Sequence, residues 1–244
     1  MATLTATSTS NPVDSATATR TRTVVASATS TACTIGYTDV APDSTYYGYI
    51  RCLTCKGAIS GYPDGTFREG TPMTRGQIAK VVSQAAGFND SPGTQIYSDV
   101  PPSHTFYAYI NGLSRRGIVS GYSCSEGADS GCSPEYPLLF RPERLTTRGQ
   151  LAKIVSNAAN ISDEVSGQIY ADVPSEGEGS TFYVWIMRLS QKQVMGGYAC
   201  GTSDPRSGPC DEHNSPYFRP NNDVSRGQVA KIVANTFFPT CLAP

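Results

Sequence analysis

Thr74-Arg75-Gly76-Gln77-Ile78-Ala79-Lys80 is a phrase that this chain repeats twice more. The other two copies are Thr147-Arg148-Gly149-Gln150-Leu151-Ala152-Lys153 and Ser225-Arg226-Gly227-Gln228-Val229-Ala230-Lys231. Counted from Arg75, the second copy follows after 73 residues and the third after a further 78. A phrase that recurs at such intervals marks an internal repeat.

Each copy predicts the start of an α-helix. Thr or Ser followed three residues later by Gln is a capping box, in which the hydroxyl accepts a hydrogen bond from the third helical N–H and Gln reaches back to the N–H of the cap. Apolar residues then follow at helical spacing and predict one buried face per helix. They are Ile78, Val81, Val82 and Ala85, then Leu151, Ile154, Val155 and Ala158, then Val229, Ile232, Val233 and Phe237.

A second repeated block precedes each phrase. It opens with an aromatic residue, any residue, Asp and Val, and its aspartates are Asp39, Asp99 and Asp172. An aromatic-rich segment follows at 46–50, 106–110 and 182–186, and predicts a second amphipathic helix per copy. Gly57 and Gly117 are predicted to end the first two of these helices, whereas Gln193 stands at that place in the third.

Together these blocks resemble the S-layer homology family of bacterial cell-envelope proteins. The likeness lies in the aromatic-x-Asp-Val opening, in the turn Gly61-Tyr62-Pro63-Asp64-Gly65-Thr66-Phe67 and in the Thr-Arg helix start. It implies a mainly α fold, in which three helix-loop-helix repeats form a pseudo-threefold bundle with grooves between its lobes. We place the repeats at residues 34–92, 93–166 and 167–244.

The resemblance also implies a function. The chain would be a non-catalytic structural protein at the outside of a bacterium, binding an envelope polysaccharide that carries acidic groups such as pyruvate ketals. The family's anion-contacting Arg matches Arg75, Arg148 and Arg226, and Arg offers a planar fork of donors to a carboxylate. The family usually has Ala-Glu where these copies have Gly-Gln. The other candidate glycan-binding residues are Gln77, Gln150, Gln228, Asp39, Asp99, Asp172, Tyr49, Tyr109 and Trp185.

Structural roles compete for the same residues. The three Arg side chains could pair with the Asp of the upstream block, and each Asp could cap the helix that follows it. Among the aromatic residues, Tyr46, Phe106 and Phe182 are expected in the core and Tyr49, Tyr109 and Trp185 at the surface. Lys80, Lys153 and Lys231 are expected on the solvated helix face. Insertions at 123–139 and 199–217 predict that the three grooves are not equivalent.

Eight cysteines indicate an oxidising compartment. Two pairs bracket the insertions and are predicted to close them, namely Cys124 with Cys132 and Cys200 with Cys210. Cys52 and Cys55 lie one helical turn apart, within reach of a disulfide, and their pairing would leave Cys33 to join Cys241. The rival pairing joins Cys33 to Cys52 or to Cys55. A redox or zinc role for Cys52-x-x-Cys55 is disfavoured because the chain has no second such motif and only two His.

Composition narrows the function classes. A net charge of −1 with 16% charged residues gives no reason to expect a nucleic-acid partner. No apolar run has the length of a transmembrane helix. The sequence offers no Ser–His–Asp arrangement and no metal-ligand cluster, and the acidic residues of the insertions are typical of solvated loops. We therefore expect no enzyme activity, cofactor or metal.

Residues 1–33 form a different kind of sequence, dominated by Thr, Ser, Ala and Val. This composition is typical of a flexible, often O-glycosylated stalk. Its threonines also alternate, at positions 3, 5, 7 and 9 and at 17, 19, 21 and 23, which suits an extended strand. Such an arm could dock on a neighbouring copy. The alternative function is therefore a self-assembling subunit of an extracellular filament or lattice. No charged-then-apolar leader opens the chain, so we expect a processed or partial chain.

Overall fold

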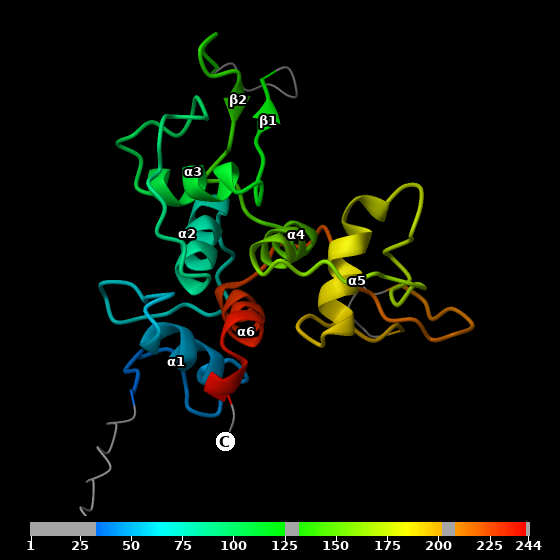
Figure 1. The fold of residues 1–244 in the computed structure, drawn as a ribbon. Helices are drawn as coiled ribbons and strands as arrows, with labels where there is room; N and C mark the ends of the chain where they lie inside the picture. Colours follow the sequence, from blue (N-terminus) through cyan, green and yellow to red (C-terminus); the bar gives the residue numbers. More distant parts are fainter. Residues whose placement is uncertain (1–32, 125–131, 202–207, 243–244) are drawn as a thin grey trace, which may run out of the picture. The chain divides into compact units, whose positions relative to one another are not determined.

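The computed structural model describes residues 33–124, 132–201 and 208–242, so the arm and its predicted self-association lie outside the described residues. The described part is mainly helical, as predicted (Figure 1). Its α-helices are α1 (Tyr47–Cys55), α2 (Arg75–Ala85), α3 (Tyr107–Arg115), α4 (Arg148–Ala158), α5 (Tyr183–Gln191) and α6 (Arg226–Phe237). Two short 3₁₀ helices, η1 (Ser180–Phe182) and η2 (Pro239–Leu242), and an antiparallel pair of strands, β1 (Tyr122–Ser123) and β2 (Leu138–Leu139), complete it.

The three predicted capping boxes are confirmed. Thr74, Thr147 and Ser225 are the N-caps of α2, α4 and α6, and each side chain accepts a hydrogen bond from the backbone of the Gln three residues later. The Gln side chain in turn accepts from the N–H of the cap, at 3.1 to 3.2 Å. A cap of this kind is worth about 1 kcal/mol to a helix.

The aromatic-rich segments form α1, α3 and α5, and these helices end where predicted. Gly57 and Gly117 follow the first two helices with φ of 71° and 69°, in the left-handed region that Gly adopts without penalty. Gln193 takes the same conformation after α5, with φ of 58°. The third stop therefore keeps its geometry despite the change of residue.

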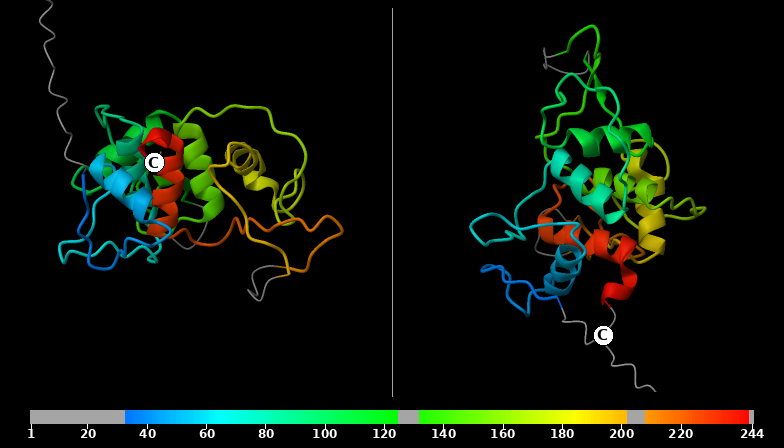
Figure 2. Two further views of the ribbon diagram at one scale, coloured as in Figure 1. Left: turned by 90° about the horizontal axis from the view of Figure 1, so that it is seen from below. Right: turned by 60° about the vertical axis from the view of Figure 1, so that its left-hand side comes forward.

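The helices pair across the sequence copies rather than within them. The second helix of one copy packs on the first helix of the next, so that α2 packs on α3 and α4 packs on α5. At the ends of the chain α6 packs on α1, and Figures 1 and 2 both show these two helices side by side. Contacts of α2 with both α4 and α6 join these pairs, and one hydrophobic core runs through all six helices.

The segments that lead into α2, α4 and α6 are joined by a closed cycle of backbone hydrogen bonds. Met73 N–H donates to Val224 O at 3.1 Å, Val224 N–H donates to Thr146 O at 3.0 Å, and Thr146 N–H donates to Met73 O at 2.9 Å. All three residues are buried. The cycle links residues that are 73 and 78 positions apart in the sequence, and it fixes the starts of these three helices against one another.

The disulfides confirm one prediction and correct another. Cys124 pairs with Cys132 and Cys200 with Cys210, as predicted. The predicted pairs Cys52–Cys55 and Cys33–Cys241 are wrong, because Cys33 pairs with Cys55 and Cys52 with Cys241. The reason is the direction of the two side chains on α1: Cys52 is buried and faces η2, whereas Cys55 is exposed at the end of the helix. The Cys33–Cys55 bond is one form of the rival pairing.

Candidate functional site

The three repeated Arg side chains are buried and bind backbone carbonyls of another copy. Arg75 donates through Nε to Phe140 O at 2.9 Å and through Nη2 to Ser120 O at 3.2 Å. Arg148 makes the same two bonds to Phe218 O and Gly196 O, at 2.9 and 2.8 Å. Arg226 makes them to Phe67 O and Ser60 O, at 2.8 and 2.9 Å. The predicted Arg–Asp pairing is thus replaced by hydrogen bonds to the main chain.

Each guanidinium also lies against two aromatic rings. Arg75 lies 4.4 Å from the centre of the Phe140 ring and 5.2 Å from that of Tyr122. The corresponding rings are Tyr198 and Phe218 for Arg148, and Tyr62 and Phe67 for Arg226. Burial lowers the pKa of all three Arg side chains below its ordinary value. A guanidinium in this position stabilises the fold through its contacts with the rings and the carbonyls. Its N–H groups that do not bind these carbonyls face the neighbouring side chains.

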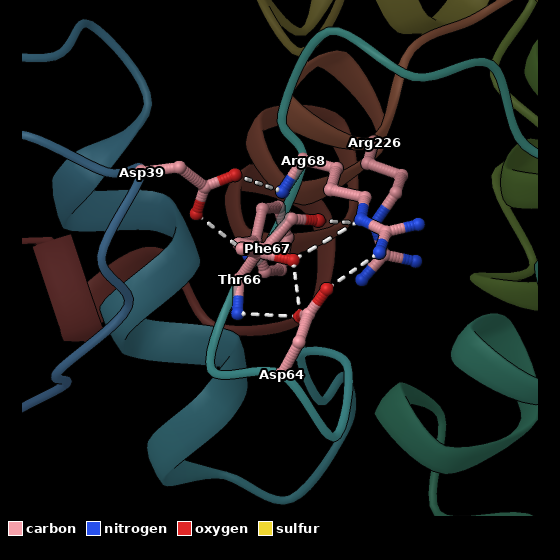
Figure 3. A network of polar contacts seen from close by, with 6 residues as sticks. All are labelled: Asp39, Asp64, Thr66, Phe67, Arg68 and Arg226. Carbon is pink, nitrogen blue, oxygen red and sulfur yellow. Dashed lines mark hydrogen bonds and ion pairs between the residues drawn. The ribbon is translucent and has the colours of Figure 1, made fainter.

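The aspartates of the upstream blocks hold the turn that carries these carbonyls. Asp39 accepts hydrogen bonds from the N–H groups of Phe67 and Arg68, both at 2.7 Å (Figure 3). Asp99 and Asp172 do the same for residues 140–141 and 218–219. The Arg residue of each turn has a positive φ, of 60° to 62°, and the carboxylate stabilises that conformation. Burial raises the pKa of Asp39, but the two amide donors outweigh it and lower the pKa below the ordinary value.

Figure 3 shows that the backbone of Phe67 links two copies, since its N–H donates to Asp39 and its carbonyl accepts from Arg226. The glycan-binding role predicted for Asp39, Asp99 and Asp172 therefore competes with a structural role that the geometry makes evident. The prediction that each Asp caps the helix that follows it is wrong, because α1, α3 and α5 all begin without a side-chain cap.

The Gly of each repeated phrase is explained by an aromatic ring that lies directly on it. A Cβ at Gly227 would stand 2.6 Å from the Tyr46 ring, and Cβ atoms at Gly76 and Gly149 would collide with Phe106 and Phe182 in the same way. These aromatic residues precede the first helix of the following copy. The Gly residues thus permit the close contact between α2 and α3, α4 and α5, and α6 and α1.

Three grooves lie beside the buried Arg side chains, with volumes of about 160, 200 and 200 Å³. We name each groove after its Arg. Their shared lining is an Arg, a Tyr that follows Gly, a Gln, a Lys and an aromatic ring. The Arg226 groove has Tyr62, Gln77, Lys80 and Phe106; the Arg75 groove has Tyr122, Gln150, Lys153 and Phe182; the Arg148 groove has Tyr198, Gln228, Lys231 and Tyr46.

The lining corrects two expectations. Lys80, Lys153 and Lys231, expected on a solvated face, are half-buried groove residues. Tyr46, Phe106 and Phe182, expected in the core, pack against it with one part and line the grooves with the other. The groove tyrosines were not predicted as site residues. Their signal in the sequence is a repeated Gly-Tyr pair, at 61–62, 121–122 and 197–198.

The aromatic residues expected at the surface are half-buried, and two of them, Trp185 and Tyr49, lie beneath groove lysines. Lys153 Nζ stands 4.7 Å from the centre of the Trp185 ring, and Lys231 Nζ stands 5.7 Å from that of Tyr49. The rings attract each ammonium group and favour its position at the groove. Tyr109 is half-buried at the corresponding place in α3. These residues support the grooves rather than form their walls.

The grooves are not equivalent, as the insertions predicted. Gln150 and Gln228 donate to the hydroxyls of Tyr122 and Tyr198, at 3.3 and 3.1 Å. The Arg148 groove also shares Arg148, Tyr198 and Gln228 with a larger polar cavity of about 650 Å³, to which Arg219 and residues 221–223 contribute. Around the Arg226 groove, the turn is instead closed on itself: Asp64 accepts from Arg68 and from the Thr66 hydroxyl, both at 2.6 Å (Figure 3).

Comparison with known proteins shows the same repeated unit elsewhere. Residues 36–79 and 96–152 match the family model of the S-layer homology domain. The chain carries S-layer homology domains. The matched segments cover the helix start Thr74-Arg75-Gly76-Gln77 and its second copy, and the third copy of the phrase makes the same contacts.

Three curated proteins are similar to this chain at low identity. They are S-layer protein EA1 of Bacillus anthracis, Cell surface glycoprotein 1 of Acetivibrio thermocellus and Surface-layer 125 kDa protein of Lysinibacillus sphaericus. Identities are 25%, 23% and 21%, over 82%, 72% and 77% of this chain. The matched part makes up 20%, 7% and 14% of those proteins, so this chain spans only a small portion of the length of each. Among the described residues, no helix has the length and apolarity that crossing a membrane requires.

Proposed function

We propose that this chain is a non-catalytic surface protein that attaches to a cell-envelope polysaccharide of a bacterium through its three grooves. The observation that carries the proposal is the recurrence in every groove of one Arg, one Lys, one Gln and a Tyr ring. Two cations beside an aromatic wall suit a sugar that bears a carboxylate, because the ring packs against the sugar face and the cations bind the acid.

The S-layer homology match and the names of the relatives support this proposal, because all three are named as surface or S-layer proteins. We further propose that repeats 34–92, 93–166 and 167–244 form a pseudo-threefold bundle. In support, each buried Arg binds the next copy in cyclic order, and the hydrogen bonds between Met73, Thr146 and Val224 close a cycle.

The grooves are small for the ligand that they would hold. Each is below the roughly 300–1,000 Å³ of a typical small-molecule site. A groove of this size would accept one acidic sugar and leave the rest of the polymer outside. The Arg148 groove is the exception, since the adjoining polar cavity offers room for further sugar units. We therefore propose that it makes the largest contribution to binding.

The groove lysines are better probes of binding than the arginines. Removing Arg75, Arg148 or Arg226 would break two hydrogen bonds to main-chain carbonyls, one of them buried, so that lost binding could reflect lost folding. Lys80, Lys153 and Lys231 are half-buried and contact the grooves without such bonds to the main chain. Lys→Gln substitutions remove the charge and keep an uncharged polar side chain at the same place.

The experiment measures co-sedimentation of the chain with bacterial cell-wall sacculi that retain their acidic polysaccharide. We expect Lys80→Gln, Lys153→Gln and Lys231→Gln each to weaken retention, by about tenfold for a lost charge-assisted contact, with the largest loss in Lys231→Gln. The matched control is Lys192→Gln, which removes an exposed ion pair with Asp163 outside the grooves. Circular dichroism of each variant shows whether it is folded.

Two results would contradict the proposal. The first is equal retention of all four folded variants, which would remove the grooves from the binding site. The second is unchanged retention on sacculi from which the acidic polysaccharide has been extracted, which would exclude that polymer as the ligand.

A further inference from the structure

The end of α6 packs on α1 as the end of α2 packs on α3. Phe88 follows α2, and the centre of its ring lies 4.0 Å from the guanidinium carbon of Arg116 at the end of α3. Phe238 follows α6, and Nζ of Lys56 at the end of α1 lies 5.8 Å from the centre of its ring. The pair of α6 and α1 thus resembles the other pairs, although the two helices stand near opposite ends of the described sequence.

On the way into the second copy, the chain continues from Phe88 and is held against α3 by Arg115. Nε of Arg115 donates to Pro92 O and its Nη2 donates to Thr94 O, both at 3.0 Å. Gly93 lies between these two acceptors, and a Cβ on it would stand 2.5 Å from the nearest guanidinium nitrogen. Hydrogen bonds therefore fix the segment between α2 and α3 to the end of α3.

The first copy has disulfides where the second has these hydrogen bonds. Cys55 occupies the place on α1 that Arg115 occupies on α3, and it is bonded to Cys33 across a sequence separation of 22 residues. Cys52, one helical turn earlier on α1, is bonded to Cys241 of η2. No peptide segment connects α6 to α1 directly. The two disulfides instead attach the chain before α1 and the chain after α6 to one turn of α1.

We propose that these two disulfides form a covalent path that carries tension past the three copies. A pull on the chain before Cys33 passes through the first bond to Cys55. It then follows the last turn of α1 back to Cys52 and leaves through the second bond to Cys241. The rest of the three copies lies in the two loops that these bonds close. Those loops carry no load while the bonds hold.

The path avoids the three grooves. Among the described residues, those on the path line none of them. Tyr46 lies in the shorter closed loop, and the other groove residues lie in the longer one. The contacts that shape the grooves therefore stay intact when the chain is pulled. That this preserves attachment to a polysaccharide rests on the proposed function, whereas the path itself depends on the disulfides alone.

The test pulls single full-length molecules by their two ends in a force spectrometer and measures the length released at each step. In each variant both cysteines of a pair are replaced, so that no thiol is left over. The Cys52→Ser/Cys241→Ser chain should release the segment from 55 to 241, which is roughly 55–60 nm when extended, because the loops of the other two disulfides stay closed. The Cys33→Ser/Cys55→Ser chain should release only the segment from 33 to 52, roughly 6–7 nm.

The unmodified chain with all its disulfides formed should release neither length. The matched control is Cys124→Ser/Cys132→Ser, which also lacks one disulfide but loses it inside the longer loop, so it should behave like the unmodified chain. A long release from the unmodified chain or from the control would overturn the proposal, and so would the absence of a long release from Cys52→Ser/Cys241→Ser. Should that variant not fold, the unmodified chain decides alone: the long step contradicts the path, and its absence supports it.

Discussion

At the scale of single residues, the structure explains why the repeated phrase has Gly where the family usually has Ala. The three residues are Gly76, Gly149 and Gly227. Each lies beneath an aromatic ring of the following copy, where a methyl group has no room. The sequence shows that Gly stands where the family usually has Ala, but it does not show the reason. The ring that covers Gly76 belongs to Phe106, about 30 residues further along the chain. Sequence reasoning cannot assign such a contact without knowing which helices pair.

Gly76→Ala tests this contact. The added Cβ would collide with the Phe106 ring, so we expect a loss of about 1–3 kcal/mol in the free energy of unfolding. The measurement is urea denaturation. Gly48→Ala is the control: it lies in α1 with nothing within 4 Å of the added Cβ, and should stabilise the protein by up to about 1 kcal/mol. Equal effects of both substitutions would show that Phe106 does not determine the residue at 76.

At the scale of elements, the helices were the most predictable part of the fold. Capping boxes located the starts of α2, α4 and α6, and apolar spacing predicted their buried faces, because both signals are local. The disulfides of α1 were mispredicted because pairing depends on which face of the helix meets η2 and which meets Cys33. The prediction that Lys80, Lys153 and Lys231 lie on a solvated face was wrong for the same reason. The polar face of a helix becomes the wall of a groove when another copy packs beside it.

The turn at Asp64 gives an element-scale prediction in pH. Hydrogen bonds from Thr66 and Arg68 lower the pKa of Asp64 from 3.8 to about 2. A carboxyl group whose pKa is lowered by folding stabilises the folded state above its unfolded pKa, and that stabilisation is lost as the pH falls through the folded value. The stability difference between the unmodified chain and Asp64→Asn should therefore be constant above about pH 4 and disappear toward pH 2.

Urea denaturation across this pH range provides the measurement. Asp43→Asn, an exposed substitution outside the turn, is the control for the loss of one carboxylate. A difference that persists unchanged to pH 2 would show that the ionised Asp64 does not stabilise the turn.

At the scale of the whole molecule, the described copies depend on one another. Their helices pair across copy boundaries, their Arg side chains bind the next copy, and the Cys52–Cys241 bond closes a loop over a sequence separation of 189 residues. By the chain-entropy model such a bond stabilises the folded chain by about 5 kcal/mol. The sequence predicted three copies that share a core. It did not reveal that each helix packs mainly on a helix of another copy rather than on the second helix of its own copy.

Native-state hydrogen exchange on the oxidised chain tests this interdependence most directly. If the copies share one interior, the slowest amides of α1 to α6 should all exchange with the same opening free energy and the same dependence on urea, because they open together. Stepwise exchange, in which the helices of one copy lose protection at a lower free energy while those of the others keep it, would contradict the account.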